Sequence, residues 1–395
     1  MESVPRTPNA SERWIPTLDG WRAVAILLVL LDHGGDPIIR TVLAAAGHTE
    51  PYFPREYEFL KMPFGFAGVH LFFALSGYLI TSRLIEEERR RTHASLTDFY
   101  LRRLFRIQPA AILYLVIIFI LSKFALISIS RPAWFSAAFG YANLMTAYHT
   151  YYTGHFWTLA IEEQFYLLWP ATFILLAARN RLVAAVAIAL VAGIWRDIAI
   201  EYQLTNSWLR TDFEGEWLMW GCIAALVQQV GWGKRLVGTM STPATRVVVL
   251  SLTALFIAYA SINWKSPNGA VSLAAATTPL LFIATARYPS GLLGRVLSSR
   301  PTVWLGQISY SLYLWQQLFF VWDNFRSPAM GVLQSMPLRI VMALGCASIS
   351  HYCLEKPMIE LGRRIIRRLN TRARPVTSVQ SPPIDAAASV INRSL

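Results

Sequence analysis

The chain has 395 residues, of which 54% are hydrophobic and 15% are charged, and its formal net charge at pH 7 is +13. Soluble proteins carry about 25% charged residues, so this composition excludes an ordinary soluble enzyme and indicates a polytopic membrane protein. No helix-turn-helix, RNP or zinc-finger pattern accompanies the positive charge, and the three cysteines have no zinc-ligand spacing. We therefore expect neither a nucleic-acid partner nor a bound metal.

Ten apolar stretches have the length of a transmembrane helix, about 17 to 22 residues. They lie near 16–33, 65–84, 108–128, 155–178, 182–200, 213–230, 246–263, 270–286, 302–322 and 338–354. The sequence thus predicts an all-α integral membrane protein with about ten transmembrane helices. Trp134 to Ala147 is apolar but too short to cross, which favours a re-entrant or interfacial segment.

Most Lys and Arg residues fall on one side of this predicted topology: the N-terminus, the loops after even-numbered spans and the C-terminal tail. Because cytoplasmic loops are enriched in basic residues, both termini are expected in the cytoplasm. The expected domains are a cytoplasmic segment at 1–15, a membrane domain at 16–360 and a basic, disordered cytoplasmic tail at 361–395.

The first predicted span carries ionisable residues at both ends. Arg22 and His33 are eleven residues apart, so on a helix they project from one face, about 16 Å apart along the axis. Charged groups inside a bilayer are costly and usually functional. The alternative is structural: Asp19 and Arg22 pair at i, i+3 near the head groups, while His33 only caps the outer end.

The second span begins with His70 and contains Ser76, which is a weak candidate nucleophile because it has no Gly-x-Ser-x-Gly elbow and no evident base. The basic loop that follows contains Arg102, Arg103 and Arg106, interleaved with aromatic residues. Arginine forks suit phosphate oxygens, so this cluster is a candidate site for a nucleotide-like carrier. By spacing alone, contact with lipid head groups is an equal alternative.

The fourth span opens with His155 and Trp157, followed by the polar group Glu162, Glu163 and Gln164. Two glutamates at that depth must face protein or water rather than lipid. We expect one of them to neutralise an arginine of a neighbouring helix and the other to be free for chemistry or substrate binding.

Topology sorts these candidate residues into two expected layers. The histidines and glutamates (His33, His70, His155, Glu162 and Glu163) map to the outer half, and the arginines (Arg22, Arg102, Arg103 and Arg106) to the inner half or inner face. A carrier with an anionic head and a long thin arm, held by arginines and reaching a histidine, would match the offset between Arg22 and His33. Acyl-coenzyme A is such a molecule.

Five ordered blocks closely resemble those of the bacterial type 3 membrane acyltransferases, over roughly residues 14–360. They are Leu18-Asp-Gly-Trp-Arg-Ala-Val-Ala with His33, Gly68-Val-His-Leu-Phe-Phe-Ala-Leu-Ser-Gly-Tyr-Leu-Ile-Thr, Phe99-Tyr-Leu-Arg-Arg-Leu-Phe-Arg-Ile-Gln-Pro, Phe156-Trp-Thr-Leu-Ala-Ile-Glu-Glu-Gln-Phe-Tyr-Leu-Leu-Trp-Pro and Leu305-Gly-Gln-Ile-Ser-Tyr-Ser-Leu-Tyr-Leu-Trp. The resemblance implies a ten-helix enzyme of the bacterial inner membrane that O-acylates envelope or secreted carbohydrates, usually with acetyl from acetyl-coenzyme A. Two positions depart from it: many relatives have Asp where this chain has His70, and His where it has Gln316.

The resemblance places the family's essential Arg and His on Arg22 and His33, its Arg-x-x-Arg motif on Arg103 and Arg106, and its acidic block on Glu162 to Tyr166. His33 is then the expected general base, with Glu162 or Glu163 orienting it or binding the acceptor. Expected acceptor-binding residues are His70, His155, Gln164 and Trp157. Direct transfer and an acyl-histidine relay both remain open.

Expected partners are membrane lipid, the carbohydrate acceptor and other glycan-assembly proteins. The rival interpretation is a multi-helix transporter or exporter in which His33 and the glutamates relay protons or bind a polar substrate. It is disfavoured because the chain shows no evident inverted repeat and carries the basic, aromatic-rich loop.

Overall fold

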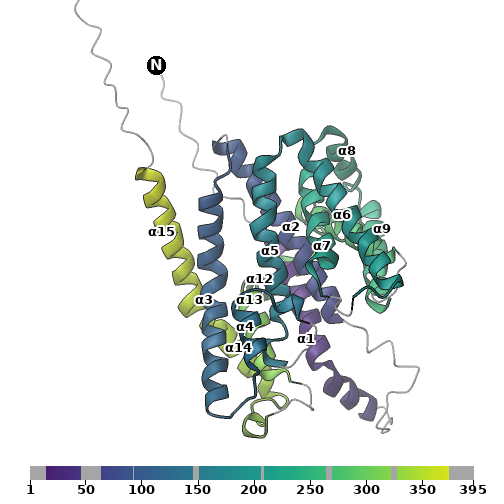
Figure 1. Cartoon of the computed structure of the whole chain (residues 1–395). Coiled ribbons are helices and arrows are strands. Elements are labelled where there is room, and N and C mark those ends of the chain that lie inside the picture. The colour runs from purple at the N-terminus through teal and green to yellow at the C-terminus, as the bar shows by residue number, and fades with distance from the viewer. Residues whose placement is uncertain are drawn as a thin grey trace, which may run out of the picture.

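The computed structural model describes residues 15–45, 64–91, 93–145, 151–205, 209–263, 269–321 and 327–372. Residues 34–45 are described by their backbone only. Within these ranges the chain forms helices and the turns between them, and no strand occurs in this described part (Figure 1). The predicted all-helical class is therefore confirmed.

The long helices are α1 (Pro16–Ala45), α2 (Phe64–Arg91), α3 (Leu96–Lys123), α5 (Phe156–Leu175), α6 (Ala178–Glu201), α7 (Thr211–Val227), α9 (Pro243–Ile262), α10 (Ala270–Arg287) and α15 (Lys356–Arg372). Shorter ones are α4 (Arg131–Ala138), α8 (Gly231–Thr239), α11 (Leu292–Leu297), α12 (Arg300–Gln307), α13 (Ser309–Phe319) and α14 (Leu338–Ile349).

Five helices of the described residues are long and apolar enough to cross a bilayer: α2, α3, α6, α9 and α10. The predicted spans at 16–33, 155–178 and 213–230 form the single helices α1, α5 and α7. Two predicted spans are interrupted. That at 302–322 is divided into α12 and α13, and that at 338–354 passes from α14 into a π-helical segment at Ser350–Glu355.

Helix α2 lies at the centre of the bundle and α9 at its margin. In their most apolar windows, 72% of α2 is buried but only 17% of α9. Exposed apolar side chains such as Val247 and Leu255 line the outer face of α9, which is the surface expected of a helix that faces lipid. In Figure 1, α6, α8 and α9 lie on one side of the bundle and α3 and α15 on the other.

Helix α3 begins well before its apolar stretch, at Ser95, whose side chain caps it by accepting a hydrogen bond from the backbone N–H of Asp98 at 3.2 Å. Such a cap satisfies one of the open N–H groups of the first turn. The arginine segment that the sequence placed in a loop is therefore helical, and Arg103 and Arg106 are one turn apart on a single helix.

Helix α1 approaches α11 and α12 without intervening side chains. A Cβ added at Gly20 would lie 2.3 Å from the carbonyl oxygen of Leu297, and one added at Gly306 would lie 1.9 Å from that of Asp19. Only glycine permits backbones to come this close. These two contacts fix the stretch of α1 that carries Arg22 against the break between α12 and α13.

The short apolar segment near Trp134 forms α4 and one 3₁₀ turn at Ala142–Leu144, neither long enough to cross a membrane. At the C-terminal end, α15 continues to Arg372, twelve residues past the expected domain boundary at 360. It packs along α3: Gly362 lies against the ring of Phe105, and the Asn370 amide donates to Asp98 Oδ2 at 2.9 Å. These contacts explain why residues 361–372 are ordered rather than a free tail.

Candidate functional site

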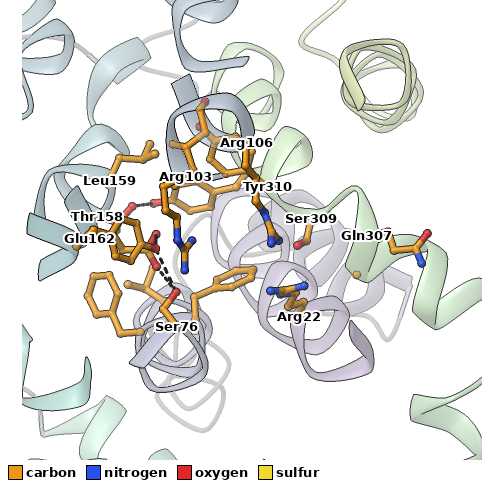
Figure 2. Close-up of a pocket in the computed structure, with 17 residues that line it drawn as sticks. Arg22, Ser76, Arg103, Arg106, Thr158, Leu159, Glu162, Gln307, Ser309 and Tyr310 are labelled. Atoms are coloured by element: carbon orange, nitrogen blue, oxygen red, sulfur yellow. Dashed lines mark hydrogen bonds between the residues drawn. The ribbon is translucent and has the colours of Figure 1, made fainter. Parts of the chain in front are cut away.

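Five parts of the fold line a partly open cavity of about 110 Å³: α1, α2, α3, α5 and the junction of α12 with α13. Three guanidinium groups line it, from Arg22 on α1 and from Arg103 and Arg106 on α3. Figure 2 shows the three pointing into the same space from two different helices. The structure thus brings together arginines that lie some eighty residues apart in the sequence.

The three arginines differ in how their charge is balanced. Arg22 Nη1 donates to Asp19 Oδ1 at 2.8 Å, which confirms the i, i+3 pair that the sequence suggested. The guanidinium of Arg103 lies over the ring of Tyr166, 4.1 Å from its centroid. Among the described residues, no carboxylate lies within ion-pairing distance of Arg103 or Arg106. The cavity consequently holds an excess of positive charge, an environment that favours an anion.

Glu162 is the acidic residue of the cavity lining, and neutral hydroxyls hold its carboxylate. Ser76 Oγ donates to Oε1 at 2.7 Å and Tyr166 Oη donates to Oε2 at 2.7 Å, as the dashed lines in Figure 2 mark in part. The expectation that Glu162 lies in a separate outer layer is wrong, because α5 brings it beside the arginines. Ser76 enters the site as a partner of Glu162.

Glu163 and Gln164 point away from the cavity. The Gln108 amide donates to Glu163 Oε1, and the Gln164 amide donates to the carbonyl of Gly140 at 3.2 Å and to Asn143 Oδ1 at 3.1 Å. One of the two glutamates was expected from the sequence to neutralise an arginine. Within the described residues neither does so, because both accept from neutral groups in place of a guanidinium.

His33 lies on the same unbroken helix as Arg22, so the eleven residues between them correspond to a rise of about 16 Å. It is half-buried and is not among the residues that line the cavity. Its Nδ1 is 2.9 Å from the carbonyl oxygen of Val29. A carbonyl can only accept, so Nδ1 is the ring nitrogen that donates in this contact, and in a neutral imidazole Nε2 then keeps its lone pair.

The other predicted acceptor residues of α2 and α5 lie outside the cavity lining. His70 Nε2 is 2.9 Å from Glu214 Oε2, and its ring stacks on Trp217 at a centroid distance of 3.9 Å. Trp157 packs edge-on against Phe73, with ring centroids 6.0 Å apart. His155 is buried at the start of α5.

Arg102 differs from its two neighbours on α3. Its Nη2 donates to Glu87 Oε2 at 2.7 Å, and 36% of its side chain is exposed. It does not line the cavity. Of the three arginines expected to grip a phosphate, the structure places two in the cavity and one in a surface ion pair.

The junction of α12 with α13 lines the cavity with residues that were not predicted from the sequence: Gln307, Ser309, Tyr310 and Tyr313. Tyr310 Oη donates to the carbonyl of Ile107 at 2.8 Å, which ties α13 to α3. The block from Leu305 to Trp315 contributed to the family resemblance, but its spacing gave no sign that it faces Arg22, because the break at Ile308 redirects these side chains.

Fold and cavity together define a polytopic membrane protein with a cationic internal site. The chain belongs to the acyltransferase domain family, whose model matches residues 15–351. No solved structure gives a significant match.

Three relatives illustrate what the chain is similar to. A putative peptidoglycan O-acetyltransferase of Bacillus subtilis is 28% identical over 385 residues, covering 90% of this chain and 56% of the relative. An O-acetyltransferase of Staphylococcus aureus is 28% identical over 380 residues, with 89% and 58% covered. A peptidoglycan O-acetyltransferase of Listeria monocytogenes is 26% identical over 385 residues, with 90% and 58% covered. The chain thus spans little more than half the length of these relatives.

Proposed function

We propose that this protein is a membrane O-acetyltransferase that moves an acetyl group from acetyl-coenzyme A to a hydroxyl of a cell-envelope carbohydrate. The family match and the names of the relatives support the reaction class. The observation that carries the donor assignment is the convergence of Arg22, Arg103 and Arg106 on one cavity. The relatives' names make peptidoglycan the first acceptor to test.

The cavity fits the phosphate end of an acyl-coenzyme A. Arginine forks bind phosphate oxygens through paired, charge-assisted hydrogen bonds. Arg103 and Arg106 have no carboxylate partner among the described residues, so an incoming phosphate need not displace one. Arg103 is held in place by the Tyr166 ring, whose hydroxyl is bonded to Glu162. In this arrangement the arginines bind the donor and the Ser76–Glu162–Tyr166 network positions them.

His33 is the proposed general base. With its Nδ1 proton directed to the Val29 carbonyl, Nε2 is the atom that accepts the proton of the acceptor hydroxyl. The hydroxyl oxygen then attacks the thioester carbonyl carbon, the carbon–sulfur bond breaks, and the coenzyme A thiolate leaves. His33 returns its proton to the thiolate or to solvent, so the transfer needs no further reactant.

We further propose that ten helical segments cross the bacterial inner membrane, with both termini in the cytoplasm. Beyond α2, α3, α6, α9 and α10, the additional spans are α1, α5, α7, the α12–α13 pair and α14 with its π-helical extension. The distribution of Lys and Arg supports this orientation. It directs the N-terminal ends of α1 and α3, and hence the arginine cavity, toward the side that contains acetyl-coenzyme A.

The test uses the full chain in proteoliposomes supplied with acetyl-labelled acetyl-coenzyme A and peptidoglycan fragments. Free thiol and labelled glycan are measured for the wild type and for His33→Ala. We expect the wild type to release thiol and label the glycan, and His33→Ala to do neither while still binding the donor. A folded wild type without turnover on any bacterial glycan would contradict the proposal and favour the alternative that the protein is a transporter.

A further inference from the structure

Three buried side chains behind the cavity wall have polar atoms with no hydrogen-bond partner in the described structure: both ring nitrogens of His155, Nε1 of Trp315 and Oε1 of Gln316. Their exposed fractions are 4%, 5% and 0%. Buried polar groups are nearly always hydrogen-bonded, because leaving one unsatisfied costs its full desolvation energy. Several such atoms close together indicate a site that something polar completes.

Two of the three residues, His155 and Trp315, are neighbours around Tyr114. Its ring meets His155 edge-on at a centroid distance of 5.2 Å and Trp315 edge-on at 5.6 Å. The hydroxyl that could have satisfied them is used elsewhere, since Tyr114 Oη donates to the carbonyl of Tyr152 at 2.7 Å. Gln316 follows Trp315 on α13. We call His155, Trp315 and Gln316 the buried polar cluster.

The buried polar cluster adjoins the arginine cavity. On the cavity side, Thr158 and Tyr313 line the cavity, and the Tyr313 hydroxyl both accepts from Thr158 at 2.8 Å and donates to the carbonyl of His155 at 3.2 Å.

Helices α1 and α5 each carry a cavity residue and a histidine. On α1, Arg22 lines the cavity and His33 lies three turns further along. On α5, Glu162 lines the same cavity and His155 lies two turns back toward the helix start. The two helices therefore place charged groups together at the cavity, and His33 and His155 each lie further along their own helix.

We propose that the buried polar cluster binds the amide-bearing arm that joins the phosphates of the acyl donor to its thioester. The inference rests on acetyl-coenzyme A being the donor. A neutral His155 offers one donor and one acceptor, Trp315 offers a donor and Gln316 offers an acceptor. Two amide groups, each with one C=O and one N–H, complement this set, and the pantetheine arm contains two amides.

The position of the cluster favours the donor arm over the carbohydrate acceptor. A thin chain running from phosphates at Arg103 to a thioester at His33 must pass the level of His155. The rings of Tyr114, Tyr313 and Trp315 pack edge-on around this level, so a thin chain fits there more readily than a sugar ring. The acceptor then reaches His33 from the opposite side.

Two half-ligands test the inference on the full chain in nanodiscs. Acetyl-pantetheine carries the amide arm without the adenosine phosphates, and adenosine 3′,5′-bisphosphate carries phosphates without the arm. We expect Trp315→Phe, Gln316→Met and His155→Phe each to weaken acetyl-pantetheine binding about three- to tenfold, as the loss of one or two hydrogen bonds implies. Bisphosphate binding should stay unchanged in all three. Arg103→Ala should give the opposite pattern.

Trp169→Phe is the matched control. Trp169 is as buried as Trp315, but its Nε1 donates to Thr81 Oγ1 at 2.8 Å, away from the cluster. This variant should lower the melting temperature without changing acetyl-pantetheine affinity. Gln316→Met preserves side-chain volume, so it keeps the test decisive if His155→Phe fails to fold.

The outcomes separate the inference from the proposed function. If the wild type binds acetyl-coenzyme A but all three cluster variants keep wild-type affinity for acetyl-pantetheine, the inference is wrong and internal water completes the cluster. If the wild type binds neither acetyl-coenzyme A nor the bisphosphate, the donor assignment itself fails and the inference falls with it.

Discussion

Two regions of this bundle balance the charge of arginine in opposite ways. At the contact of α6 with α7, Arg196 pairs with Glu216 and with Asp197, at 2.9 Å from the latter. In the cavity, Arg103 and Arg106 lie next to one another with no carboxylate in range among the described residues. A buried arginine that is paired with carboxylates holds two helices together. Arginines that have no carboxylate partner indicate where an anion binds. The partners of an arginine therefore distinguish structural from functional charge in this bundle.

The largest effect is expected on stability, from a substitution at the contact of α6 with α7. Glu216→Ala leaves Arg196 buried with the loss of its closest carboxylate, and removing one partner of a buried pair costs about 3–5 kcal/mol. Thermal unfolding in detergent should show a large drop in melting temperature. Protein that remains folded should bind acetyl-coenzyme A as the wild type does; a loss of affinity without a loss of stability would reverse the assignment of the two regions.

The next effect belongs to the cavity. Arg103→Ala and Arg106→Met remove charge-assisted hydrogen bonds to phosphate, each worth about 1.5–3 kcal/mol, so acetyl-coenzyme A should bind about ten- to hundredfold more weakly. Stability should hold or rise, because like charges are moved apart. Calorimetric titration beside a melting curve checks both. Unfolding of either variant at wild-type donor affinity would show that these arginines are structural.

The two adjacent glutamates sharpen the comparison further. Glu162→Gln disturbs a carboxylate that accepts from both Ser76 and Tyr166, and an amide has only one oxygen with which to accept. We expect the transfer rate at saturating donor to fall about tenfold, from the cost of one unsatisfied buried group. Glu163→Gln should change the rate by less than about threefold, because Gln108 can reorient to pair with an amide. Equal effects would contradict the separation of Glu162 from Glu163.

The smallest effect comes from Arg102→Ala, the matched control for Arg103→Ala. Arg102 is partly exposed and paired with Glu87, and such pairs contribute about 0.2–1 kcal/mol. Donor affinity should change by less than about threefold. A loss as large as that of Arg103→Ala would mean that the donor reaches beyond the cavity to the helix surface.

Much of this fold was predictable because an apolar stretch of bilayer length can be recognised in a single sequence. The helices α1, α2, α5 and α10 lie where hydropathy placed them. The break at Ile308 was not predicted, because the whole stretch from 302 to 322 is apolar enough to read as one span. The break lies next to a contact between Gly306 and α1, which involves residues almost three hundred positions apart.

The site was predictable in its chemistry and less so in its grouping. The predicted donor-binding set was Arg22, Arg102, Arg103 and Arg106, and the cavity contains all of these except Arg102. Glu162 was placed at the wrong level, because counting residues from a helix end ignores the depth at which α5 begins. Partners such as Ser76 for Glu162 and Glu214 for His70 depend on packing between helices, about which a single sequence carries no signal.

The glycine contacts of α1 with α11 and α12 have a consequence for how this cavity can change. At Gly20 and Gly306 the backbone of α1 lies directly against the backbones of α11 and α12. No side chain lies between these helices there, so substituting residues one at a time cannot change their spacing in small steps. The lining from α2, α5 and α13 can vary one residue at a time without moving the frame. Substitutions can therefore change which ligand the cavity prefers while the width of the cavity stays constant.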